Sequence, residues 1–201
     1  MEYIIKHVTN EQALDRALAL DEKVFGESSA YHNPAYSREK WLERMRSSYN
    51  DCMLYAQAGC ETIGIVFGHI ESNRSITIGP VAVNEQYRKH GIARKLMLLL
   101  EKRAAEHGIN LLTLGAAENA EGFYEKLGYT GSLLIQSEKH SIYELLSLNT
   151  KYKVNYTRVY DGTVNQVNLA LPCADRALQS AYEATLPGCH TLMMFCKRIE
   201  I

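Results

Sequence analysis

The stretch ITIGPVAVNEQYRKHGIARKLMLLL, from Ile76 to Leu100, decides the fold of this 201-residue chain. It opens with β-branched residues over 76–83, which predict a strand. A short polar loop follows, and an apolar helical pattern begins at Ile92. The first amide N–H groups of a helix have no intrahelical partners, and the helix dipole places about half a positive charge there. The pattern therefore predicts an anion-binding site at the start of this helix.

The loop before the helix is basic and contains a glycine. Gly91 lets the backbone approach a ligand closely, because it has no side chain. The sequences typical of a P-loop and of a dinucleotide-binding turn are absent from the chain. A solvated helix start is the plainer alternative, but the adjacent glycine favours a phosphate site. The residues expected to contact the phosphates are Arg88, Lys89, His90, Gly91, Ile92, Ala93 and Arg94.

Arg88, Gly91 and Ala93 form the pattern R-x-x-G-x-A, which resembles the pyrophosphate loop of the GNAT superfamily of acyl-CoA-dependent N-acyltransferases. A second block, ENAEGFYEKLGY at residues 118–129, looks like the closing helix of the same family. The resemblance covers about residues 1–140. It implies an α/β (α+β) fold with a mixed, mostly antiparallel central sheet flanked by helices.

The resemblance also implies acetyl-CoA, that is coenzyme A with an acetyl group, as co-substrate. Its pantetheine arm would lie along the strand residues Val81, Ala82 and Val83. Gly79-Pro80 is expected to form a β-bulge just before them, because proline cannot donate to a strand ladder. The family's usual asparagine position is Ala117 here. Asn119, two residues later, either binds the pantetheine arm or only caps a helix.

Tyr124 stands where the family has its general acid, so the resemblance implies that it contacts the cofactor and protonates the leaving thiolate. A packed aromatic side chain is the alternative. Members that modify histone lysines carry a glutamate base at the position that is Thr77 here, so a fixed carboxylate is not expected there. Other conceivable bases, none of which is favoured, are Glu27, His69 and Glu71.

The resemblance implies an N-acetyltransferase in which a primary amine of a small molecule or peptide attacks the thioester directly. The acceptor is expected to lie against Gly26–Tyr36 and the first two helices. A non-catalytic acyl-CoA-binding regulatory module is the alternative function. Nucleic acid is not an expected partner, because the net charge is −1 and no basic stripe is present.

Composition further narrows the class of protein and its cellular compartment. The chain is 46% hydrophobic and 22% charged, as in ordinary globular proteins, and it contains no apolar stretch long enough for a membrane span. Its five cysteines include no C-x-x-C pair, so no metal site is expected. Reduced thiols, and an N-terminus that does not look like a signal peptide, favour a cytoplasmic location.

The sequence predicts two domains, the GNAT-like domain at 1–140 and an extension at 141–201. Strand patterns at 152–160 and 163–171 flank Asp161-Gly162, which is a strong hairpin signal. A helix at 174–184 and a strand at 191–199 complete a β-β-α-β extension. It can complete the sheet, cover the substrate pocket or pair two subunits as a homodimer, and we expect a structural or oligomeric role.

Near the N-terminus, a strand is expected over 3–8, followed by a helix that runs to about Phe25. Thr9 and Gln12 have the spacing of a capping box at the start of that helix. Ser37 is expected to cap a second helix, and strands are expected at 53–56 and 62–70.

Overall fold

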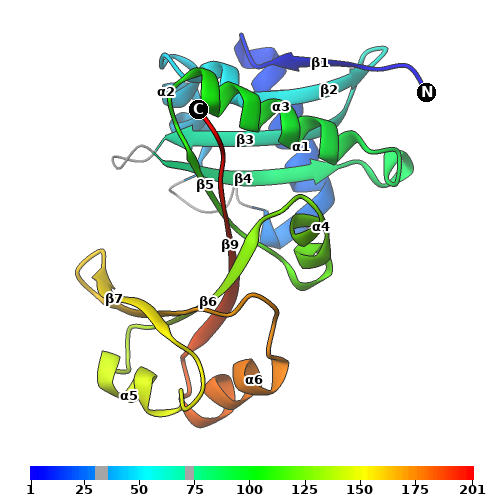
Figure 1. Cartoon of the computed structure of the whole chain (residues 1–201). Coiled ribbons are helices and arrows are strands. Elements are labelled where there is room, and N and C mark those ends of the chain that lie inside the picture. The colour runs from blue at the N-terminus through cyan, green and yellow to red at the C-terminus, as the bar shows by residue number, and fades with distance from the viewer. Residues whose placement is uncertain (30–35, 71–74) are drawn as a thin grey trace. The chain divides into compact units, whose positions relative to one another are not determined.

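Figure 1 shows a computed structural model of the chain, which describes residues 1–29, 36–70 and 75–201. The contacts divide the chain into two compact units. Unit 1 comprises Met1–Thr113 and Arg198–Ile201, and unit 2 comprises Leu114–Lys197. The basic loop before Gly91 thus belongs to unit 1, and Tyr124 belongs to unit 2. The domain division at residue 140 stays a prediction.

The strands of unit 1 follow one another in the order β1-β2-β3-β4-β5. Their bounds are β1 Ile4–His7, β2 Met53–Ala58, β3 Glu61–Ile70, β4 Ser75–Val83 and β5 Leu111–Gly115, the last of which ends in unit 2. The first four pair antiparallel, and β4 pairs parallel with the first residues of β5. The expected mixed, mostly antiparallel sheet is therefore confirmed.

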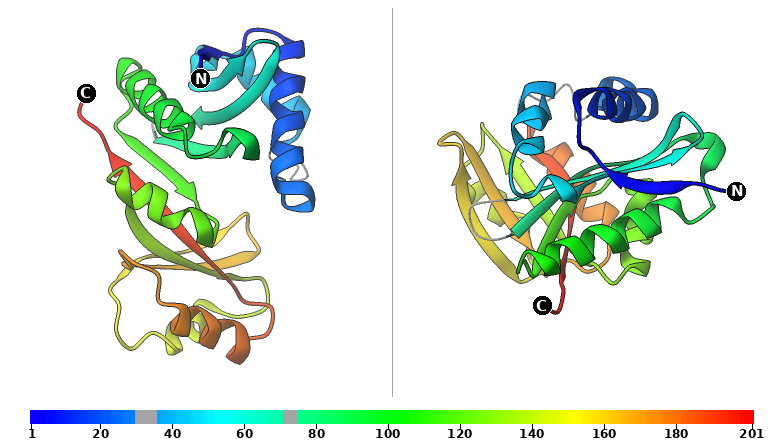
Figure 2. Two further views of the ribbon diagram at one scale, coloured as in Figure 1. Left: turned by 90° about the vertical axis from the view of Figure 1, so that its right-hand side faces the viewer. Right: turned by 90° about the horizontal axis from the view of Figure 1, so that it is seen from above.

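Helices lie on both faces of this sheet, as the right-hand view of Figure 2 shows. The helices of unit 1 are α1 Glu11–Phe25, η1 Gly26–Ser28, α2 Arg38–Met45, η4 Asn50–Cys52, η5 Glu85–Tyr87 and α3 Ile92–Glu106. Helices α1 and α2 cover one face, where the fully buried Trp41 packs edge-on against Phe67 of β3. Helix α3 covers the opposite face.

The capping box expected at Thr9 is wrong, because α1 begins one residue later. Its N-cap is Asn10, whose Oδ1 accepts a hydrogen bond of 2.9 Å from the Ala13 amide. Asparagine and threonine are both common N-caps, so two adjacent capping residues left the start of the helix ambiguous. Ser37 caps α2 as expected.

Unit 2 contains an antiparallel sheet in the order β9-β6-β8-β7. Its strands are β6 Thr130–Ser137, β7 Val154–Tyr160, β8 Val164–Leu169 and β9 His190–Arg198, the last of which ends in unit 1. The helices are η6 Glu118–Ala120, α4 Glu121–Lys126, α5 Ile142–Ser147 and α6 Arg176–Thr185. The expected β-β-α-β extension is confirmed as β7, β8, α6 and β9, and its strands complete a sheet with β6. Helix α5 was not predicted.

The hairpin between β7 and β8 turns where the sequence placed it. Asp161 has a φ of 51° and Gly162 a φ of 73°. Two successive residues in the left-handed region are typical of the tight turns that match strand twist. Within the described ranges, no helix is both long enough and apolar enough to cross a membrane.

Candidate cofactor-binding site

Strand β4 is deformed just before it reaches Val81–Val83. Val66 of β3 pairs with Val81, but Gly68 pairs with Ile78, so both residues of Gly79-Pro80 stand opposite Phe67 alone. The expected β-bulge is therefore confirmed.

The edge of β4 that faces β5 is open beyond this bulge. Among the described residues, β4 pairs with β5 only at Ser75–Thr77. Val81–Val83 pair with β3 on their other side. An unpaired strand edge offers N–H and C=O groups to a ligand that carries amides.

The loop after β4 turns into α3 through two left-handed residues. Lys89 has a φ of 64° and Gly91 a φ of 74°. Gly91 is the N-cap of α3 and contributes no capping side chain. Its carbonyl oxygen accepts from the Lys95 amide at 3.0 Å, so the amides of residues 92–94 form the first turn, which lacks intrahelical partners. The expected helix start at Gly91 is confirmed.

A carboxylate from a distant strand holds the base of the loop. Glu61 of β3 accepts hydrogen bonds from Asn84 Nδ2 at 2.7 Å and from the Tyr87 hydroxyl at 2.9 Å. The bond to Glu61 raises the pKa of Tyr87 above its usual value. Asn84 is itself buried, and its Oδ1 lies 3.4 Å from the Gln86 amide. Sequence reasoning missed Glu61, because its partners are more than twenty residues away along the chain.

Gly64 allows the first turn of α3 to approach the sheet. It pairs with Val83, the last residue of β4. A Cβ atom at Gly64 would lie 2.7 Å from Ile92 Cγ2, well inside van der Waals contact. The glycine therefore sets how close the start of α3 lies to the end of β4.

The basic side chains of the loop are exposed. Arg88 donates from Nε to the Val83 carbonyl oxygen at 3.3 Å, and His90 Nδ1 lies 2.8 Å from the Arg88 carbonyl oxygen. Lys95 Nζ lies 5.1 Å from the centre of the Tyr3 ring. Unit 1 thus brings an open strand edge, a first helical turn and several cationic side chains together. That combination suits a ligand with amide and phosphate groups.

Tyr124, in α4 of unit 2, is largely buried among aromatic rings. Its ring centroid lies 5.1 Å from that of Phe123, 6.1 Å from that of Tyr129 and 5.9 Å from that of Phe195. Burial raises the pKa of Tyr124 to about 12. The phenol therefore stays protonated at neutral pH, as a proton donor to a thiolate must.

Asn119 is exposed within η6, also in unit 2. The N-cap of η6 is Ala117 and that of α4 is Ala120, so the interpretation of Asn119 as a helix cap is wrong. The chain starts these short helices without a side-chain cap. A contact between Asn119 and the cofactor stays a prediction.

The conceivable bases have different surroundings. Thr77 Oγ1 lies 3.4 Å from Thr113 Oγ1, between β4 and β5. His69 is buried beside the rings of Tyr36 and Trp41. Glu27 is exposed in η1. Glu71 lies outside the described residues, as do residues 30–35 of the expected acceptor region.

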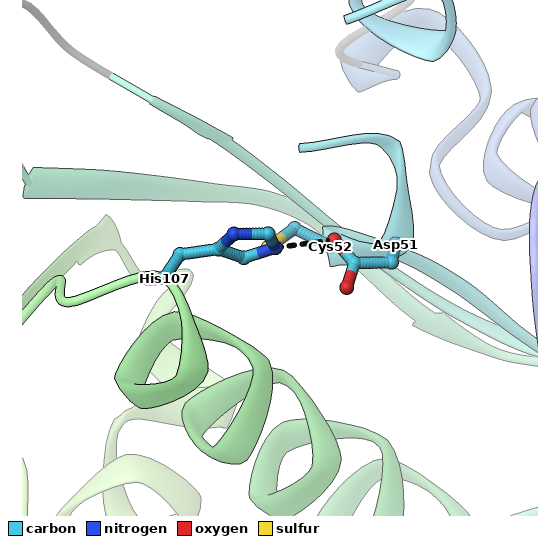
Figure 3. Close-up of side chains that lie close together, drawn as sticks. All are labelled: Asp51, Cys52 and His107. Carbon is cyan, nitrogen blue, oxygen red and sulfur yellow. Dashed lines mark hydrogen bonds and ion pairs between the residues drawn. The ribbon is translucent and has the colours of Figure 1, made fainter. Parts of the chain in front are cut away.

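Asp51, Cys52 and His107 form the cluster of possible metal ligands that the described part of the chain contains (Figure 3). His107 Nε2 lies 2.7 Å from Asp51 Oδ1, and Arg103 Nε lies 3.9 Å from Asp51 Oδ2. Burial raises the pKa of Cys52 to about 12, which disfavours the thiolate that a metal requires. A guanidinium beside the carboxylate also opposes a cation. The Asp51–His107 contact instead joins η4 to the end of α3.

Known proteins share sequence and fold with this chain. The sequence model of the acetyltransferase (GNAT) domain matches residues 7–143. A candidate acetyltransferase of Bacillus subtilis (strain 168) is 28% identical over 128 residues, which cover 62% of this chain and 82% of that protein.

Two solved structures share the fold. PaiA N-acetyltransferase from Thermoplasma acidophilum, in complex with coenzyme A, gives a TM-score of 0.54 at 17% identity, covering 85% of this chain and 100% of that one. Diaminobutyrate acetyltransferase EctA from Paenibacillus lautus, in complex with L-2,4-diaminobutyric acid and coenzyme A, gives 0.51 at 15% identity, covering 87% and 98%.

Proposed function

Because this chain belongs to the GNAT acetyltransferase family and is an acyltransferase, we propose that it transfers the acetyl group of acetyl-CoA to a primary amine of a small molecule or peptide. One observation carries the proposal. The open edge of β4 at Val81–Val83 runs directly into a basic loop whose Gly91 is the N-cap of α3. An amide-bearing arm followed by a diphosphate fits that sequence of groups.

In this proposal the pyrophosphate accepts hydrogen bonds from the amides of residues 92–94. Arg88, Lys89 and Arg94 supply positive charge around it, and His90 is a further contact. The pantetheine amides pair with the backbone of Val81–Val83 as an added strand would.

The chemistry is acyl transfer by direct attack. A neutral amine forms a C–N bond to the thioester carbon, and the C–S bond of the tetrahedral intermediate breaks. The amine nitrogen loses a proton to water, since Thr77 provides no carboxylate. Tyr124 protonates the departing thiolate and regains its proton from solvent. The Tyr124 phenol carries its proton at neutral pH and so has one to donate, and Asn119 is proposed as a contact to the cofactor.

The nature of the acceptor is also a proposal. The Thermoplasma acidophilum structure holds coenzyme A, and the Paenibacillus lautus structure holds a diamine acid beside coenzyme A. The first supports coenzyme A as co-substrate, and the second supports an amine acceptor. We further propose that the protein works in the cytoplasm, where its five free thiols stay reduced.

A panel of amines with detection of released thiol tests the function. Tyr124→Phe should lower turnover by about 10²-fold or more, with acetyl-CoA affinity unchanged. Tyr182→Phe is the matched control. It removes a buried hydroxyl that donates to the Leu145 carbonyl oxygen at 2.7 Å, so it should lower stability but leave turnover intact. Undiminished turnover in Tyr124→Phe would remove the proposed acid. Tight binding of acetyl-CoA with no turnover on any amine would favour a regulatory module.

A further inference from the structure

Unit 2 contains a pocket of about 440 Å³ that the proposed acetyl transfer does not use. It lies where β6 ends, and its wall includes Gln136, Lys139, Tyr160, Val164 and His190. Its volume is within the range of small-molecule sites.

A row of side chains runs across all four strands to this pocket. Arg158 of β7 pairs with Gln166 of β8, Gln166 pairs with Gln136 of β6, and Gln136 pairs with His190 of β9. Residues directly opposite one another on neighbouring strands project from the same face of a sheet. The row therefore joins Arg158 of β7 to Gln136 and His190, two residues of the pocket wall.

The hydrogen bonds along this row have a fixed direction. Arginine has only donors, and Arg158 Nε donates to Gln166 Oε1 at 2.8 Å. Gln166, which is buried, must then use its Nε2, and this donates to Gln136 Oε1 at 2.9 Å. Because Gln136 Oε1 is directed at Gln166, its NH₂ group is the donor that remains for a ligand in the pocket.

Two aromatic rings hold Arg158, the first residue of the row, in place. The Arg158 guanidinium carbon lies 5.3 Å from the ring centres of both Tyr156 and Tyr160. Contacts with two rings restrict the conformers of the guanidinium and keep its Nε directed at Gln166. The orientation of the Gln136 amide is thus imposed from two strands away.

We propose that this pocket binds the carboxylate of a small organic acid. The Gln136 amide donates to it, and Lys139 and His190 line the same wall. The Tyr160 ring and Val164 provide an apolar surface for the body of the acid. Glu138 also lines the pocket, so a ligand with a single negative charge fits better than a dianion.

Titration of the full-length protein with benzoate, against benzamide as its neutral isostere, tests the proposal. Calorimetry should show benzoate binding at least about tenfold more tightly, because only the carboxylate matches a wall of donors. The side-chain NH₂ resonances of Gln136 should shift with benzoate. Equal affinities, no binding of either compound, or tighter binding of inorganic phosphate than of benzoate would overturn the proposal.

Variants distinguish the effect of the hydrogen-bonded row from general effects of charge. Gln136→Glu replaces the donor by a carboxylate and should abolish benzoate binding. Arg158→Met removes the group that fixes the amide direction and should weaken binding several-fold. Gln57→Glu, an equal change of charge in unit 1, should have no effect. None of these residues belongs to the proposed cofactor site, so acetyl transfer should persist in all three. If Gln136→Glu binds benzoate as tightly as the wild type does, the proposed role of the Gln136 amide is wrong.

Discussion

Replacing Gly64 by alanine tests whether the distance between the start of α3 and the sheet controls cofactor binding. The added Cβ would lie 2.7 Å from Ile92 Cγ2 and 3.2 Å from Leu96 Cδ1, whereas ordinary contact begins at 3.4 Å. Ile92 must therefore retreat by about 0.7 Å, the difference between 3.4 and 2.7 Å. Overpacking of this kind costs about 1–3 kcal/mol of folding free energy. Ile92 is the first residue of α3, so its retreat displaces the amides proposed to hold the pyrophosphate.

Gly68→Ala is a matched control on the same strand. Its Cβ would lie 2.9 Å from Ile76 Cγ2 and 3.0 Å from Leu100 Cδ1, so the crowding is comparable. Leu100 lies two turns further along α3, away from the loop. Both variants should lose about 1–3 kcal/mol of unfolding free energy in urea titrations. Only Gly64→Ala should also weaken coenzyme A binding, by about tenfold, the loss expected when one charged hydrogen bond is misplaced.

The comparison of the two variants decides the matter. Calorimetric titration with coenzyme A, well below the unfolding temperature, gives both dissociation constants. If Gly64→Ala binds as the wild type does, the position of Ile92 does not govern the site. If Gly68→Ala loses as much affinity, the effect is one of general stability, and the reasoning from local contact fails.

Three further outcomes are expected. Gly91→Asp should abolish coenzyme A binding in the same titration, because it places a negative charge beside phosphate, whereas the isosteric but neutral Gly91→Asn meets the same φ of 74° and should retain most of it. A thiol reagent should modify the exposed Cys60, Cys173 and Cys196 quickly and the buried Cys52 and Cys189 only after unfolding. Because burial raises the pKa of Tyr124 from 10.0 to about 12, its contribution to stability is intact below pH 10 and is lost as the pH rises from 10 to 12, so Tyr124→Phe should show a shallower alkaline loss in urea titrations.

Local patterns were enough to predict most of the elements. The strand, loop and helix around Gly91 were readable because each is decided by a few neighbouring residues. The Asp161-Gly162 turn and the bulge at Gly79-Pro80 were predicted for the same reason. Even the missed helix α5 carried a local signal, since Ser141 and Glu144 form a complete capping box.

Contacts between distant segments were not readable. The Glu61 carboxylate meets Asn84 and Tyr87 only because β3 and β4 pair in one particular register. A register shifted by one residue would turn Glu61 to the other face of the sheet. The row that joins Arg158 to Gln136 depends on two registers at once. Pairings of this kind depend on the strand registers of the whole sheet, and no short motif predicts them.

The difference explains why this sequence predicts a cofactor more readily than an acceptor. Binding a diphosphate through main-chain amides requires only a glycine, a small residue and a helix start, so the surrounding side chains can vary widely. Structures only 15–17% identical to this chain accordingly keep the fold and hold coenzyme A. An acceptor must be recognised by side chains, and these change with each substrate. The short motif at Arg88–Ala93 therefore predicts coenzyme A, while the choice of amine depends on side chains that the motif leaves unconstrained.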